Sequence, residues 1–114
     1  MSTWWETRRT ARLAEVAHAL EFFGAEPVED PGVGELARVA EALAGEYRTG
    51  DRGYAIHRTG DLLDWAAAAL HAADRLRGIP VPVVNHHLRR AALALDDARA
   101  CLLASPPASP VQPA

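Results

Sequence analysis

The sequence predicts an all-α protein that folds as an antiparallel four-helix bundle in up-down-up-down order. Apolar residues recur at the i, i+3, i+4, i+7 spacing of amphipathic helices in four segments, and no segment shows the alternation of a β-strand. Glycine and proline separate these segments and leave short connections, which favour antiparallel neighbours. The 114 residues suffice for one domain, which we place at residues 1–104.

Residues 59–78 form the helix on which the other elements are expected to pack. Trp65 and Leu63 widen its apolar face on either side, which is typical of a helix with more than one neighbour. Thr59 or Asp61 is the expected N-cap. The centre of the face is formed by Leu62, Ala66, Ala69, Leu70, Ala73 and Leu76.

The first helix is expected to begin at Thr3, which has the capping-box spacing to Glu6, and to end at Gly24. An acidic link with two prolines follows over residues 25–32. The core stripe of this helix contains Leu13, Val16, Ala17, Leu20 and Phe23.

The second helix is expected to start near Pro31 or Val33 and to end at Gly50. Its core face contains Leu36, Val39, Ala40, Leu43 and Tyr47. The string Arg-Thr-Gly-Asp then occurs twice, at 48–51 and 58–61, in a stretch that we expect to be irregular. Glycine stops a helix in the first copy, and threonine or aspartate caps a helix in the second.

The fourth helix is expected to start at Pro82 as a first-turn proline, or at Asn85 as a cap. Residues 105–114 are rich in proline and poor in large apolar side chains, so we expect a disordered tail with polyproline II character. The core face of the helix contains Val84, Leu88, Ala91, Ala92, Leu95, Ala98 and Leu102.

Composition limits the location and the partners. A net charge of −3, with acids and bases mixed along the chain, argues against non-specific nucleic-acid binding by the whole surface. No apolar run approaches the ~20 residues of a membrane span, and the N-terminal sequence lacks the order of a signal peptide. The single Cys101 agrees with a reducing compartment. We therefore expect a cytoplasmic protein, and the abundant alanine with arginine in place of lysine indicates a GC-rich bacterial genome.

The predicted topology gathers the aromatic residues at one end of the bundle. In an up-down bundle the start of the first helix, the stretch at residues 48–61 and the end of the fourth helix lie together. Every tryptophan and tyrosine of the chain would be at that end, among several arginines. Aromatic residues with arginine are enriched in protein-binding hot spots, and they also stack on bases and pair with phosphates. A partner, either a protein or a nucleic acid, is therefore expected to bind Arg52, Tyr54, His57 and Arg58.

The outer face of the first helix is a second candidate surface. Trp4, Ala11 and Phe22 lie opposite the core stripe, with Arg8 beside them. Exposed aromatic residues often mark contacts with other chains, so we predict a homodimer in which two copies of this helix pair antiparallel. These two surfaces favour a small non-enzymatic interaction module, an adaptor, regulator or inhibitor, that needs no metal or cofactor.

The enzymatic alternatives rest on the same helix. Arg12 and His18 have the Arg-x5-His spacing, which resembles the motif of HEPN ribonucleases, small helical domains that dimerise. The resemblance implies a metal-independent ribonuclease that uses these two residues. Glu15 and His18 match the Glu-x-x-His spacing of di-iron bundles, although the chain holds no second copy of it. The adjacent pair at 86–87 points about 100° apart on a helix, which does not suit one metal ion.

Overall fold

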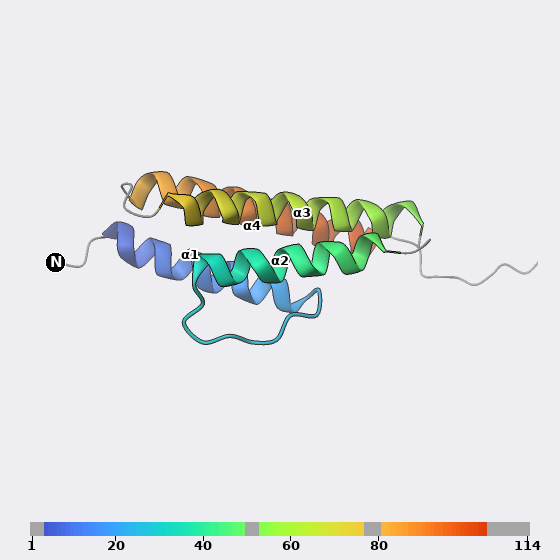
Figure 1. The fold of residues 1–114 in the computed structure, drawn as a ribbon, viewed down its shortest axis with the longest axis horizontal. Coiled ribbons are helices and arrows are strands. Elements are labelled where there is room, and N and C mark those ends of the chain that lie inside the picture. The colour runs from blue at the N-terminus through green and yellow to red at the C-terminus, as the bar shows by residue number, and fades with distance from the viewer. Residues whose placement is uncertain (1–3, 50–52, 77–80, 105–114) are drawn as a thin grey trace, which may run out of the picture.

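Four α-helices make up the described part of the chain. The computed structural model describes residues 4–49, 53–76 and 81–104, and these contain no β-strand, so the prediction of an all-α, four-helix fold is confirmed. The predicted tail at 105–114 and the expected helix ends at Thr3, Gly50 and Gly78 lie outside the described residues. The helices are α1 (Trp4–Glu21), α2 (Val33–Arg48), α3 (Tyr54–Arg75) and α4 (Val81–Ala104) (Figure 1).

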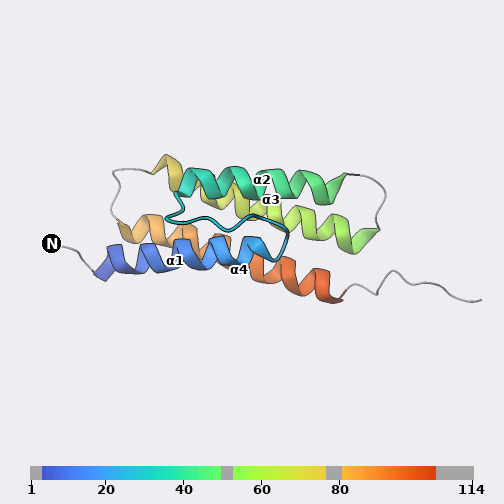
Figure 2. The ribbon, with the colours of Figure 1, turned by 90° about the horizontal axis from the view of Figure 1, so that it is seen from below.

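The helices form two layers around a thin core. α3 packs extensively on both α2 and α4, α1 lies against α4, and α1 and α2 touch at few positions. Figure 2 shows the link between α1 and α2 lying over the gap between them. The largest fully buried apolar side chains are Val16, Leu20, Leu36, Leu63, Leu70, Leu88 and Leu95.

The direction of α1 differs from the predicted up-down-up-down order. α1 and α2 run the same way, α3 runs in the opposite direction, and α4 returns (Figures 1 and 2). Phe23, just after α1, packs against Tyr47 in the last turn of α2, with ring centroids 6.0 Å apart. The reason lies in the link: Gly24 turns the chain at a φ of 112°, and the residues up to Pro31 lead back along α1. A link this long can return to the start of its helix, whereas a short connection enforces an antiparallel neighbour.

The start of α3 also differs from the prediction. α3 begins at Tyr54, so the second Arg-Thr-Gly-Asp string lies within the helix and is not an irregular segment. Thr59 is fully buried and donates its hydroxyl to the carbonyl of Ala55 at 2.9 Å, so it does not cap the helix. Thr59 and Gly60 favour a turn locally, but packing against α2 holds them in the helix.

The centre of the α3 face is buried as predicted at Ala66, Ala69, Leu70 and Ala73, but its edges differ from the prediction. Leu63, which was expected at the edge of the face, is fully buried, whereas Leu62 is only half-buried. Trp65, expected on the other edge, is 60% exposed. Small residues occupy most of the buried positions of α3, so the neighbouring helices approach too closely to cover a tryptophan on the flank.

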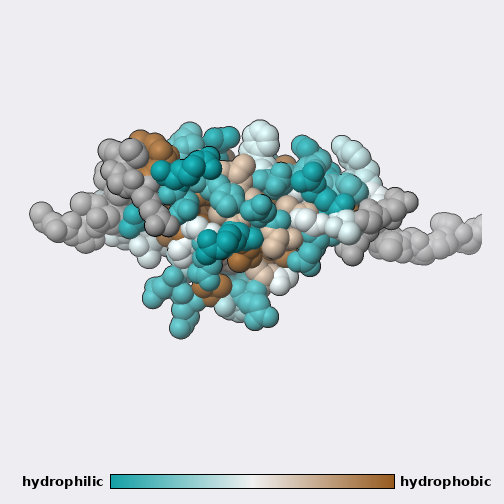
Figure 3. All heavy atoms as spheres, in the orientation of Figure 1, coloured by the Kyte–Doolittle hydropathy of each residue, from teal (hydrophilic) through white to brown (hydrophobic). Residues whose placement is uncertain are grey.

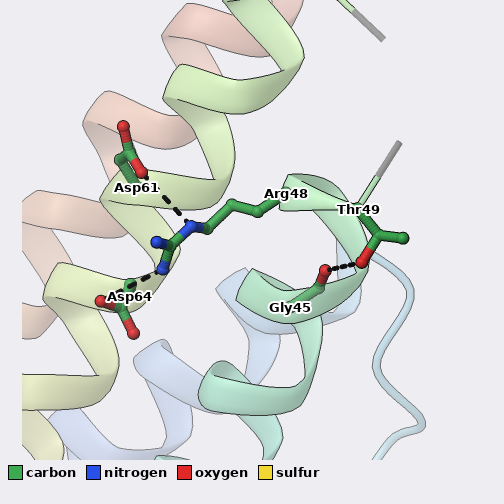
Figure 4. A network of polar contacts seen from close by, with 5 residues as sticks. All are labelled: Gly45, Arg48, Thr49, Asp61 and Asp64. Carbon is green, nitrogen blue, oxygen red and sulfur yellow. Dashed lines mark hydrogen bonds and ion pairs between the residues drawn. The ribbon is translucent and has the colours of Figure 1, made fainter. Parts of the chain in front are cut away.

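α2 lies very close to α3 at Gly60. A Cβ on this residue would overlap the Arg48 side chain and would lie 3.2 Å from both the Ala44 carbonyl and the Arg48 backbone nitrogen. The Arg48 guanidinium then extends along α3, 3.5 Å from the carboxylates of both Asp61 and Asp64 (Figure 4). These three side chains are about half exposed, so the ion pairs contribute little beyond fixing the arginine.

The surface seen in Figure 3 is mostly hydrophilic. Residues coloured as hydrophobic appear there only in small, separate groups.

We predict opposite effects for the same substitution at two helical glycines. Gly45→Ala in α2 should raise stability by about 0.5–1 kcal/mol, because nothing lies within 4 Å of the added methyl group and alanine has the higher helix propensity. Gly60→Ala should lower stability by roughly 1–3 kcal/mol, because the methyl group separates α2 from α3. Urea unfolding of both variants measures the two effects. A stabilised Gly60→Ala variant would show that the helices are not tightly packed there.

Candidate interaction surfaces

An open groove is lined by α3 and α4 alone, away from α1 and α2. Trp65 and Leu93 border it with side chains that are 60% and 52% exposed, so it presents aromatic and aliphatic surface to solvent. Exposed apolar surface framed by polar residues is typical of a binding site for another chain. The groove encloses about 440 Å³ and is lined by Arg58, Asp61, Leu62 and Trp65 of α3 and by Arg90, Leu93, Ala94 and Asp97 of α4.

The residues that line the groove form one stripe on α3 and one on α4, each with the spacing i, i+3, i+4 and i+7. The thiol of Cys101 lies 3.6 Å from the carbonyl of Ala55, which sets the start of α3 beside the end of α4. Arg58 and Asp97 therefore lie at one end of the groove. Arg90 lies at the other end, beside the tryptophan, and the apolar residues occupy the middle.

Of the groove residues, only Arg58 is among the predicted partner-binding residues. Trp65 is predicted on the flank of the core face, and Leu93 lies outside the predicted core stripe of α4. A large apolar residue off the core stripe, with an arginine three residues before it and an aspartate four residues after it, is the sequence signal that identifies this surface.

The predicted surface on α1 is only partly continuous. Trp4 is 60% exposed and Ala11 is exposed, as expected, but the Arg8 guanidinium covers part of the Trp4 ring at 4.7 Å from its centroid. Phe22 lies in the turn after α1 and is 39% exposed. It contacts Arg99 of α4 at 4.9 Å, so its ring is turned toward α4 and away from the outer face of α1.

The aromatic residues do not gather at one end. Because α1 runs parallel to α2, Trp4 and Arg8 lie at the end of the molecule opposite to the start of α3 (Figure 1). Tyr54, which is 83% exposed, stays near His57 and Arg58 in the first turns of α3. Arg52 lies outside the described residues.

The candidate catalytic residues Arg12 and His18 contact different glutamates of α1. Arg12 forms an ion pair with Glu15 at 2.6 Å. His18 is exposed and lies 3.9 Å from Glu21. Six residues along a helix rotate the side chain by about 240°, so Arg12 and His18 of one chain do not share a face. Within the described residues, no group of three or more metal-binding side chains comes together.

No family model matches the sequence, and comparisons with curated proteins and with solved structures find no match. None of the helices in the described ranges is both long and apolar enough to cross a lipid bilayer.

His87 is a half-buried titratable group near the start of α4. Its Nδ1 atom is buried and has no hydrogen-bond partner among the described residues. Burial lowers the pKa of His87 from its ordinary value of 6.5, and the positive charges of His86, Arg90 and Arg75 lower that pKa further. The folded protein therefore favours the neutral imidazole.

We predict that acidification destabilises the protein through His87. The folded-state pKa lies below 6.5, so between that value and 6.5 the unfolded chain binds more protons than the folded one. The contribution of His87 to stability is thus complete above about pH 6.5 and is lost as the pH falls through that range. The melting temperature of the His87→Gln variant should fall less between pH 7.5 and pH 5.5 than that of the wild type. An equal fall in both would contradict the assignment, and His18→Gln, at an exposed position of α1, is the matched control.

Proposed function

We propose that the protein is a non-enzymatic helical interaction module that self-associates through the groove between α3 and α4. The observation that carries this proposal is the exposed pair Trp65 and Leu93, framed by two arginines and two aspartates. Burial of such side chains against a second copy would remove apolar area from water without changing the fold of either chain. The proposal takes the protein to be cytoplasmic, as its single cysteine suggests.

The charge pattern along α4 is complementary to that of a second α4 that runs antiparallel to it. Arg90 and Asp97 lie symmetrically about Leu93 and Ala94, at the two ends of one helical stripe. When two α4 helices pair antiparallel about a two-fold axis, Arg90 of each copy meets Asp97 of the other. The small side chain of Ala94 at the centre lets the two helices approach closely, and Leu93 of each copy packs beside the axis.

The same axis supplies a favourable contact between the α3 helices. Arg58 and Trp65 are seven residues apart on one stripe, so the antiparallel pairing places the Arg58 guanidinium of one copy over the Trp65 ring of the other. Leu62, half-buried in the single chain, becomes the apolar centre of this contact. The self-complementary charge pattern on α4 favours a second copy over an unrelated partner.

A dimer of this kind leaves the other surfaces accessible. Tyr54 and His57 at the start of α3, and Trp4 and Ala11 on α1, stay exposed at the two ends of the molecule. Of these residues, Tyr54 and His57 would bind the further protein through which the module acts as an adaptor, regulator or inhibitor.

We predict a homodimer by light scattering at micromolar concentration. Trp65→Glu combined with Leu93→Glu should convert it to a folded monomer, because the new carboxylates would be buried without partners only in the dimer. Trp4→Glu combined with Phe22→Glu on α1 is the matched control and should leave the dimer intact. A wild type that stays monomeric over this range would refute self-association. Loss of the dimer in the control variant alone would place the interface on α1.

A charge exchange tests the pairing itself. Arg90→Glu should weaken the dimer, because it places two carboxylates opposite each other across the axis. Adding Asp97→Arg to this variant should restore the dimer, because the exchanged charges are again complementary. Analytical ultracentrifugation of the two variants measures the dissociation constants. If the double variant dissociates more than Arg90→Glu alone, these two residues do not meet.

A further inference from the structure

A cationic cleft lies between the first half of α1 and the first half of α4. It encloses about 170 Å³, far less than the groove on α3 and α4, and it faces a different side of the molecule. Three arginines and a histidine surround it, in a chain whose net charge is negative. The residues that line it are Arg8, Arg12, Asn85, His86 and Arg89.

The parallel course of α1 and α4 creates this cluster. Arg8 and Arg12 are four residues apart and share a face of α1, and His86 and Arg89 are three residues apart on α4. Phe22, just after α1, contacts Arg99 near the end of α4, so the two helices keep the same parallel alignment towards their C-terminal ends. An antiparallel α1 would have placed its arginines beside the aspartates at 96–97, so the direction of α1 decides the charge of the cleft.

The positive charge of the cleft is only partly compensated. Arg12 pairs with Glu15, and the Arg8 guanidinium rests on the Trp4 ring. Among the described residues, neither Arg8 nor Arg89 has a carboxylate partner. α1 and α4 both begin at this end of the molecule, so the positive ends of two helix dipoles add to the potential (Figure 1). A bound anion would relieve the repulsion among the guanidinium groups.

We propose that this cleft binds a backbone phosphate of a single-stranded nucleic acid. Guanidinium groups match a phosphate with paired N–H donors, and three arginines line this cleft. His86 supplies a further ring donor at the rim. The site is independent of the groove on α3 and α4 and does not rest on the proposed dimer.

The position of Trp4 favours a nucleic acid over a phosphorylated peptide. Its indole ring is 60% exposed and lies next to Arg8, which lines the cleft. An aromatic face beside a phosphate-binding arginine is the arrangement on which a base stacks when its backbone is held. A phosphorylated side chain has no base to place there.

The test is fluorescence anisotropy of a labelled oligothymidylate and a labelled oligouridylate at low salt. We expect saturable binding that weakens as salt is raised, and that weakens roughly tenfold or more in Arg89→Glu. Arg38→Glu, the same charge change at an exposed position of α2, is the matched control and should change the affinity less than about twofold. Arg89→Gln is the second variant, and circular dichroism checks that each variant is folded.

Base stacking on Trp4 and phosphate binding in the cleft are tested separately. Trp4→Leu should weaken oligonucleotide binding about tenfold, the order of one lost stacked base. Inorganic pyrophosphate should compete with the oligonucleotide for the cleft. Trp4→Leu should leave the affinity for pyrophosphate, measured by that competition, unchanged. Absence of saturable oligonucleotide binding, equal losses in Arg89→Glu and Arg38→Glu, or tighter binding of a phosphoserine peptide than of the oligonucleotides would overturn the proposal.

Discussion

The close approach of α2 to α3 at Gly60 is the constraint on which much of the structure depends. Without a Cβ at this position, the backbone of α2 at Ala44 and Arg48 can lie directly against α3. Alanine continues this close packing along α3 and into α4, where the buried residues are mostly small. Such seams hold helices together through many short contacts, and large side chains such as Leu63 and Leu70 occupy only a few of the buried positions.

The exposed apolar groove follows from this packing. Alanine and glycine occupy five of the eight buried positions of α3, and two of its large side chains, Trp65 and Leu62, lie on the flanks of that face. On α4 the same holds for Leu93, because Ala92 and Ala94 take the buried positions next to it. The thin core of the single chain and the apolar groove on its surface thus have one cause. Covering this groove with a second chain would bury further apolar area and add stability.

The sequence predicts the helices well and their spatial relations poorly. Val16 and Leu20 on α1, Phe23 just after it, and Val84, Leu88 and Leu95 on α4 are buried as their periodicity indicates. The start of α3 could not be predicted, since Thr59 and Gly60 favour a turn locally, whereas in the structure they are helical and Gly60 lies against α2. The direction of α1 depends on how the link after Gly24 folds back, which periodicity does not report.

The direction of α1, which differs from the prediction, changes the functional interpretation of the whole chain. With α1 reversed, Trp4 and Arg8 would join Tyr54 and Arg58 in one aromatic and basic surface at one end of the bundle. In the structure the two groups lie at opposite ends, and Trp4 and Arg8 instead lie beside the basic half of α4. α4 is therefore the helix that both proposed surfaces share. Adjacent residues on a helix point about 100° apart, so Arg89 lines the cationic cleft while its neighbour Arg90 borders the groove, and a substitution at one position leaves the other surface unaltered.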